Sequence, residues 1–126
     1  MPVRGIGVDV VQVERLAESL DRFGERMEKR LFTESELEYC RRHKTPLPHL
    51  AARFAAKEAA FKAIGTGLSG GVSWKQAEVI QPGGQVPRLR FHGAALERFL
   101  ALGCRDSHLT LSHDGGLAVA CVVLEG

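Results

Sequence analysis

The first pattern along the chain is an alternation of apolar residues with small or polar ones over positions 5–10. A two-residue period of this kind is typical of a strand with two different faces. Ile6, Val8 and Val10 share one face, and Asp9 lies on the other. The sequence therefore predicts a short strand that carries a carboxylate on the side away from its apolar residues.

Two helices are expected next, because apolar residues recur at the three- and four-residue spacing of an amphipathic helix. The first starts near residue 13, and Gly24 is its predicted end. The second covers about residues 34–42. Its start carries two signals, since Thr33 and Glu36 form a capping box and the apolar residues that flank them form a hydrophobic staple.

A third helix starts near Leu50 and ends before Gly65, which suits a left-handed C-terminal cap. The remaining elements expected are strands over residues 74–80 and 87–91 joined by a turn at 82–84, a helix over 94–102, and a hairpin of strands 108–112 and 117–124 around the Asp-Gly turn of residues 113–116. This order predicts a single α+β domain over residues 1–126, in which a small antiparallel sheet packs with helices.

The composition is that of a soluble globular protein, with 44% hydrophobic and 25% charged residues. No apolar run approaches the roughly 20 residues that span a bilayer, and the N-terminus lacks the pattern of a secretory signal. We therefore expect a cytoplasmic protein. The three cysteines are far apart and the histidines lack the short spacing of zinc ligands, so neither a disulfide framework nor a zinc site is expected.

The positive charge of the chain is concentrated in one segment. Residues 41–62 hold six basic residues and one acid, a net charge of +5, whereas the whole chain carries only +2. The six basic residues are Arg41, Arg42, Lys44, Arg53, Lys57 and Lys62. Local positive charge of this kind favours a phosphate-rich ligand or an acidic partner.

The third helix carries charges close to its apolar stripe. That stripe consists of Leu50, Phe54, Phe61 and Ile64. Lys57 projects within the stripe, and Glu58 lies about 75° from its centre. A buried carboxylate requires a cation or hydrogen-bond donors. Three explanations are open: a partly buried Lys–Glu ion pair, a lysine whose stem covers apolar surface, or a ligand that binds both charges.

The neighbours of these two charges favour the ligand. Arg53, Lys57 and Lys62 flank the single acid of this segment, and the Gly-Thr-Gly loop of residues 65–67 lets the backbone approach a ligand closely. Three cations and one carboxylate suit a phosphate bound through magnesium, which prefers one or two carboxylates together with phosphate oxygens. Asp9 is the candidate for a second carboxylate, although an acid at this place also suits the N-cap of the following helix.

Two other motifs do not support the functions that they suggest. Ser112, His113 and Asp114 are neighbours at a strand end, so their side chains point in different directions and do not form a catalytic triad. A histidine at this turn still suits contact with a phosphate or a base edge. The Gly-Ile-Gly of residues 5–7 lacks the third glycine of a dinucleotide-binding fingerprint.

Three segments together resemble the motifs of the holo-acyl-carrier-protein synthases, the small trimeric type of 4′-phosphopantetheinyl transferase. Residues 5–10 (Gly-Ile-Gly-Val-Asp-Val) are similar to the opening motif. Residues 53–63 (Arg-Phe-Ala-Ala-Lys-Glu-Ala-Ala-Phe-Lys-Ala), followed by residues 65–67, resemble the central motif, and residues 111–114 resemble the closing one. The resemblance covers nearly the whole chain and implies the fold of that family.

The resemblance implies a reaction and a set of site residues. The enzyme would transfer the 4′-phosphopantetheine group of coenzyme A to a serine of apo acyl carrier protein in fatty acid biosynthesis and release adenosine 3′,5′-bisphosphate. Asp9 and Glu58 would bind Mg²⁺, with Mn²⁺ as an alternative, and Lys62 would complete the catalytic set by acting on the leaving group. Either Glu58 or a water molecule would accept the serine proton. The residues implied in coenzyme A binding are Arg53, Lys57, Lys62, Gly65, Thr66, Gly67, Ser112 and His113.

The resemblance also implies protein partners. An acidic acyl carrier protein would dock on Arg15, Arg22 and Arg26 of the first helix, or on Arg41, Arg42 and Lys44. A homotrimer with shared sites is expected, so Ser112 and His113 would serve the site of a neighbouring subunit. Neither nucleic acid nor membrane is expected as a partner.

Two other functions are compatible with parts of the sequence. A non-catalytic phosphate- or RNA-binding domain would use the basic residues 41–62. The aromatic residues of its central helix, Phe54 and Phe61, belong to the core stripe, however, and RNA binding usually needs aromatics free to stack on bases. A small nucleotide hydrolase would instead break down coenzyme A without any carrier protein.

Overall fold

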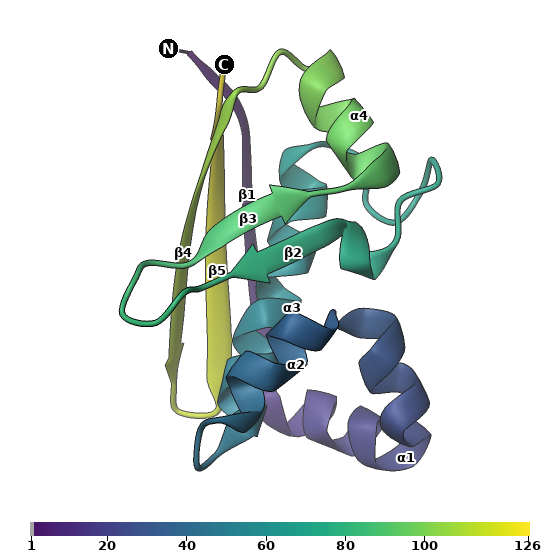
Figure 1. Cartoon of the computed structure of the whole chain (residues 1–126), viewed down its shortest axis with the longest axis vertical. Helices are drawn as coiled ribbons and strands as arrows, with labels where there is room; N and C mark the ends of the chain where they lie inside the picture. Colours follow the sequence, from purple (N-terminus) through teal and green to yellow (C-terminus); the bar gives the residue numbers. More distant parts are fainter. Residues whose placement is uncertain (1) are drawn as a thin grey trace.

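The computed structural model describes residues 2–126, which form one strand, three helices, a β-hairpin, a helix and a second β-hairpin (Figure 1). Within these residues, no helix is both long and apolar enough to span a bilayer. The elements are β1 (Val3–Gln12), α1 (Val13–Leu31), α2 (Glu34–Arg41), α3 (Pro46–Ala63), the short 3₁₀ helix η1 (Trp74–Gln76), β2 (Ala77–Ile80), β3 (Arg88–Phe91), α4 (Gly93–Ala101), β4 (Asp106–Asp114) and β5 (Leu117–Glu125).

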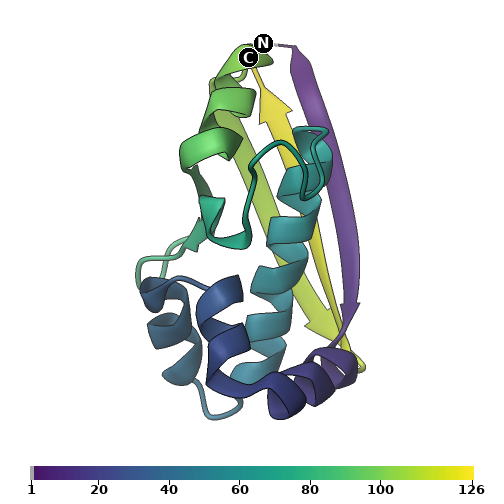
Figure 2. The same ribbon diagram turned by 90° about the vertical axis from the view of Figure 1, so that its right-hand side faces the viewer.

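The larger of the two sheets has three antiparallel strands in the order β1–β5–β4. Asp9 on β1 and Leu111 on β4 both pair with Ala120 of β5, so β1 and β4 are opposite edges of this sheet. The β2–β3 hairpin forms a second, two-stranded sheet. Helix α3 lies between the three-stranded sheet and a layer that contains α2 and the β2–β3 hairpin, and it contacts both (Figure 2). The predicted α+β fold with a small antiparallel sheet is confirmed.

The contact between β1 and α3 requires glycine at two positions of the strand. A Cβ atom on Gly5 would lie 2.2 Å from the carbonyl oxygen of Ala63, and one on Gly7 would lie 1.9 Å from the carbonyl oxygen of Ala59. Both distances are far below van der Waals contact, so any side chain here would push the strand away from the helix. These glycines let two backbones approach one another closely.

The apolar face of β1 is the face that points away from the core. Ile6, Val8 and Val10 are 64%, 54% and 57% exposed, whereas the two glycines and Asp9 lie on the side of α3. The alternation predicted from the sequence is therefore confirmed. The apolar side, however, is not covered by any helix or strand of residues 2–126 and leaves a hydrophobic row at the sheet surface.

The helix boundaries differ in part from those expected. The capping box of α2 is confirmed, since the Thr33 N–H donates to Glu36 Oε1 at 2.8 Å and the Glu36 N–H donates to Thr33 Oγ1 at 3.3 Å. Gly24 interrupts α1 as expected, because its φ of 68° and ψ of −153° are not helical, and a second helical segment follows this kink and runs to Leu31. Helix α3 begins earlier than expected, at Pro46, because proline fits the first turn of a helix.

The two hairpins also differ from expectation in detail. Residues 74–76 form η1 and not the first part of β2. The turn between β4 and β5 is shorter than the four residues expected, because Gly115 and Gly116 alone form it, with φ values of 56° and 80°. Positive φ at both central residues is typical of a tight type I′ turn. His113 and Asp114 therefore belong to β4.

Candidate functional site

Asp9 and Glu58 meet at one cavity although they lie far apart in the sequence. Asp9 comes from β1 and Glu58 from α3, and both line a pocket of about 320 Å³. The other lining residues come from the end of β1, from α1 and from α3: Val10, Val11, Gln12, Arg15, Leu16, Ser19, Met27 and Phe54. The structure thus places the two candidate metal-binding carboxylates on the same pocket.

The electrostatics of this pocket favour a bound cation. Partial burial raises the pKa of Glu58, the charge of Asp9 raises it further, and the Lys62 ammonium opposes both effects. Lys62 Nζ donates to Asp9 Oδ1 at 2.9 Å and to the carbonyl oxygen of Val8 at 3.1 Å. Two carboxylates that repel one another beside a partly exposed lysine form an oxygen donor set of the kind that magnesium binds. The residues present therefore fit a divalent cation.

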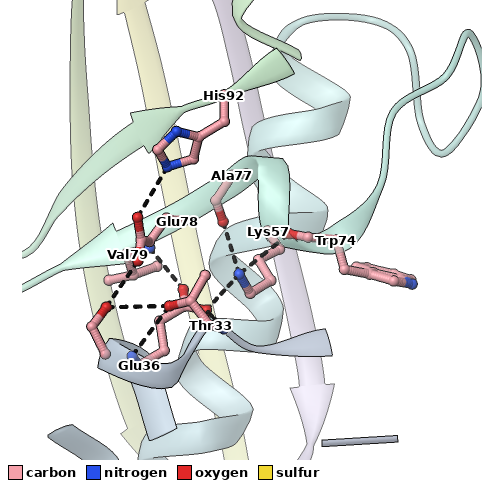
Figure 3. A network of polar contacts seen from close by, with 9 residues as sticks. Thr33, Glu36, Lys57, Trp74, Ala77, Glu78, Val79 and His92 are labelled. Atoms are coloured by element: carbon pink, nitrogen blue, oxygen red, sulfur yellow. Dashed lines mark hydrogen bonds and ion pairs between the residues drawn. The ribbon is translucent and has the colours of Figure 1, made fainter. Parts of the chain in front are cut away.

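Lys57 lies on another side of α3, inside the core (Figure 3). Its ammonium forms a 2.8 Å ion pair with Glu36, and both side chains are fully buried. Its Nζ also donates to the carbonyl oxygens of Trp74 and Ala77. Burial lowers the pKa of Lys57, and the Glu36 carboxylate opposes this shift. The expected contact between Lys57 and a phosphate does not fit this placement. A buried Lys–Glu ion pair is present instead, with Glu36 and not Glu58 as the acid.

Arg53 is also turned away from the Asp9–Glu58 pocket. It is only 2% exposed, its Nη2 donates to Gln81 Oε1 at 2.7 Å, and its guanidinium carbon lies 4.0 Å from the ring centre of Tyr39. Its Nε has no hydrogen-bond partner within residues 2–126. The Nε–H of this buried guanidinium is therefore a hydrogen-bond donor without an acceptor in the described part of the chain.

Ser112 and His113 lie on β4, and β5 separates them from the strand that carries Asp9. The ring of His113 packs 5.5 Å from that of His49, which in turn stacks at 3.6 Å on His43. Burial, together with the neighbouring imidazoles, lowers the pKa of His49 to about 4. Within one chain, Ser112 and His113 therefore do not join the Asp9–Glu58 pocket.

The Gly-Thr-Gly loop directly follows α3 and closes its C-terminus. The N–H of Gly65 donates to the carbonyl of Lys62, and those of Thr66 and Gly67 donate to the carbonyl of Phe61, at 3.1 to 3.3 Å. Gly65 has a φ of 77°, which confirms it as a left-handed cap. Because these amides are already engaged and the Thr66 hydroxyl donates to the Gly67 carbonyl at 2.9 Å, the loop offers a ligand close backbone approach and not free N–H groups.

The basic segment 41–62 does not form a continuous positive surface. Two of its six basic residues are buried, namely Arg53 and Lys57. Three others form ion pairs with acidic side chains, namely Arg41, Arg42 and Lys62. Most of the positive charge is thus compensated inside the chain, which disfavours the RNA-binding alternative.

Several residues that shape the pocket were not predicted from the sequence. Phe54 was assigned to the core stripe, but it lines the pocket and packs 5.0 Å from the ring of Trp74. Arg15 and Met27 reach the pocket because α1 folds back beside β1.

Glu36 was identified only as part of a helix cap. No periodic signal indicates that its carboxylate also reaches Lys57.

Comparison with known proteins places the chain in a family. Residues 5–122 match the family model of the 4′-phosphopantetheinyl transferase superfamily. The chain belongs to this superfamily. Over 124 residues it is 48% identical to a holo-[acyl-carrier-protein] synthase of Koribacter versatilis, and the alignment covers 98% of each chain. It is 46% identical over 123 residues to the synthase of Trichlorobacter lovleyi, again with 98% of each chain covered.

Solved structures of superfamily members share the fold. The crystal structure of a holo-[acyl-carrier-protein] synthase from Neisseria meningitidis matches with a TM-score of 0.89 at 31% identity and covers 99% of this chain and 100% of its own. A synthase from Bacillus anthracis, solved in complex with CoA (3′,5′-ADP), matches with a TM-score of 0.77 at 34% identity, with 97% and 96% of the two chains covered. The expected transferase fold is therefore confirmed.

Glu58→Gln is expected to raise the melting temperature at pH 7 and to leave it nearly unchanged near pH 4. Because the folded-state pKa of Glu58 is raised, ionisation of this carboxyl costs stability above its unfolded-state pKa. Below about pH 4 the carboxyl is protonated in both states, so the cost disappears. Calorimetry at both pH values measures the effect, with the exposed Glu97→Gln on α4 as control. A Glu58→Gln variant that melts below the wild type at pH 7 would contradict this electrostatic description.

Proposed function

We propose that this chain transfers the 4′-phosphopantetheine group of coenzyme A to a serine of apo acyl carrier protein and so serves fatty acid biosynthesis. The observation that carries the proposal is the pocket where Asp9 and Glu58 meet beside Lys62, in a chain of this superfamily. Relatives support the substrate, since a synthase from Helicobacter pylori was solved in complex with coenzyme A. The cytoplasmic location expected from the sequence is part of this proposal.

In this proposal Asp9 and Glu58 hold a Mg²⁺ ion, with Mn²⁺ as the alternative. Such an ion supplies Lewis-acid stabilisation of the charge on a bound diphosphate. Partial burial raises the pKa of Glu58 and the charge of Asp9 raises it further, so a cation bound between the two acids would stabilise both carboxylates. Lys62, whose side chain is 53% exposed, is then free to turn from Asp9 toward a phosphate oxygen.

The proposed reaction exchanges one P–O bond and moves one proton. The serine Oγ forms a bond to the β-phosphorus of coenzyme A, and the bond from this phosphorus to the bridging oxygen breaks, which releases adenosine 3′,5′-bisphosphate. Glu58, or a water molecule beside it, accepts the serine proton. Lys62 donates hydrogen bonds to the phosphate oxygens and stabilises the charge that develops on the leaving group.

The proposed active form is a homotrimer whose subunits complete each other's sites. The exposed row of Ile6, Val8 and Val10 supports self-association, because contiguous apolar surface usually marks an interface. The residues implied in nucleotide binding divide between the two edges of the sheet, since Lys62 and the Gly-Thr-Gly loop lie near β1 whereas Ser112 and His113 lie on β4. A neighbouring β4 edge, placed beside β1, supplies the missing residues.

The proposed docking surface for the acidic carrier protein is α1. Arg15 lines the pocket, and Arg22 and Arg26 are exposed and form no ion pair within residues 2–126. Phe23, which is 59% exposed, adds an apolar contact beside them. In the alternative set of Arg41, Arg42 and Lys44, the two arginines already pair with acids of the same chain. Arginines without internal partners attract an acidic protein more strongly, which favours α1.

Incubation of the chain with coenzyme A, Mg²⁺ and an apo acyl carrier protein is expected to increase the carrier mass by one phosphopantetheine group. Intact-protein mass spectrometry measures this increase directly. Asp9→Asn should reduce the rate by roughly 100-fold or more, because a cation ligand is lost, whereas the exposed Glu97→Gln should leave it unchanged. An unmodified carrier after incubation with the wild type would refute the proposed function. Salt-sensitive RNA binding that persists in Glu58→Gln would instead support the nucleic-acid alternative.

Two inactive variants are expected to restore each other if subunits share sites. Asp9→Asn lacks the acid of the β1 edge, and His113→Ala lacks the imidazole of the β4 edge. In trimers refolded from an equal mixture, about a quarter of the interfaces pair an intact Asp9 with an intact His113. The mixture should therefore recover about a quarter of the wild-type transferase rate. A mixture no more active than the mean of the two separate variants would show that each site belongs to one chain.

A further inference from the structure

A buried ion pair joins α2 to α3 (Figure 3). Neither of its residues lines the Asp9–Glu58 pocket. Glu36 and Lys57 lie 2.8 Å apart, and neither side chain is exposed to solvent. Two opposite charges in the core are costly to desolvate, and a well-packed apolar pair of similar volume is often as stable or more stable. Stability alone therefore does not explain why this chain keeps charges at these two positions.

Backbone groups satisfy the remaining hydrogen-bonding capacity of the Lys57 ammonium and the Glu36 carboxylate. Lys57 Nζ donates to the carbonyl oxygens of Trp74 and Ala77 at 3.3 and 2.9 Å. Glu36 Oε2 accepts from the N–H of Val79 at 2.7 Å, and Glu36 Oε1 accepts from the N–H of Thr33 at 2.8 Å. The pair thus fixes one point of α3 to both η1 and β2 and to the start of α2, through directional contacts that an apolar pair does not make.

This point of attachment sets the rotation of α3 about its own axis. Successive residues of a helix are about 100° apart, so Glu58 lies about 100° and Lys62 about 140° from Lys57. Lys57 therefore points into the layer of α2 and β2, while Glu58 and Lys62 point toward β1. A rotation of α3 by about 10° would move a carboxylate that lies roughly 6 Å from the axis by about 1 Å.

A second route links the pair to the pocket through Trp74. Lys57 holds the backbone of Trp74 through its carbonyl, and the Trp74 ring packs 5.0 Å from Phe54 and 6.0 Å from Phe61. Phe54 lines the pocket beside Glu58. The ion pair therefore constrains both the backbone before Glu58 and the apolar wall next to it.

We propose that Glu36 and Lys57 are positioning residues that fix the orientation of Glu58 and Lys62 toward Asp9. This inference rests on the proposed transferase function for its kinetic consequence, but its structural consequence is independent of any activity. Misplacement of reacting groups by about 1 Å costs on the order of 100-fold in rate. Loss of this ion pair is therefore expected to lower the rate although neither residue contacts the substrate.

The test replaces the ion pair by a neutral pair of similar size, Glu36→Gln with Lys57→Met in one chain. Neither substituted position of this double variant carries a charge, so no member of the pair is left buried with its partner removed, and we expect the variant to fold, with kcat for transfer to the carrier protein 10- to 100-fold lower. The KM for the carrier protein should stay within about threefold, because the proposed docking surface lies on α1.

The control is Phe99→Leu, a core change on α4 away from the pocket, which should lower the melting temperature and leave kcat unchanged at 20 °C.

Crystal structures of the wild type and the double variant provide a readout without activity. The separation between the Asp9 and Glu58 carboxylates should change by about 1 Å. A change in this separation would support the positioning role even if no transfer to a carrier protein were found, which separates this inference from the proposed function. An unchanged separation, or a kcat within twofold of the wild type, would overturn it.

A milder variant covers the case in which the double variant does not fold. Glu36→Asp keeps the charge but shortens the side chain by one methylene, so the pair has to shift for the ammonium to stay in contact. We expect a several-fold lower kcat at a melting temperature no lower than that of Phe99→Leu. A wild-type kcat in Glu36→Asp would overturn the proposal.

Discussion

The close contact between β1 and α3 is the constraint on which the rest of the structure depends. The backbone of β1 approaches the carbonyl groups of α3 so closely that a Cβ atom would not fit at Gly5 or Gly7. Because the strand lies this close to the helix, the next inward-facing residue, Asp9, comes within reach of Lys62 and onto the same pocket as Glu58. The glycines of the first sequence motif thus act by letting the strand approach the helix closely.

A single helix serves both the core and the site because its charges point in different directions. Lys57 lies in the core, where Glu36 neutralises it, whereas Glu58 and Lys62 face β1. The Glu58 carboxylate costs stability in its partly buried place beside Asp9, and its raised pKa expresses that cost. An unfavourable charge that the fold retains at a pocket is typical of a functional site. In the Glu36–Lys57 pair, in contrast, the two buried charges neutralise one another and backbone groups complete their hydrogen bonds.

The sequence predicted what depends on neighbours along the chain. The capping box of Thr33 and Glu36, the left-handed cap at Gly65 and the two faces of β1 are local properties, and all are confirmed. Helix periodicity also placed Lys57 within the apolar stripe of α3 and Glu58 at the edge of that stripe. The meeting of Asp9 and Glu58 could be proposed because family motifs joined segments that no local pattern connects.

Features that depend on tertiary packing could not be predicted in the same way. Alternation along β1 defines two faces but does not say which one α3 covers, so the exposure of Val8 and its neighbours was not foreseen. The partner of Lys57 lies 21 residues earlier in the chain, and Glu36 already had a complete local explanation as a cap. Gly24 was correctly expected to interrupt a helix, but the sequence did not indicate the second helical segment that follows it up to Leu31.

The measurement that most directly tests this account is the binding of Mn²⁺ to the free protein, followed by electron paramagnetic resonance. If Asp9 and Glu58 share one ion, the wild type binds one Mn²⁺ per chain at this pocket. Asp9→Asn and Glu58→Gln then each weaken binding by about tenfold or more, and the double variant binds no more than residual ion. Wild-type affinity in either single variant would show that the two carboxylates do not hold a common ion and would contradict the central claim.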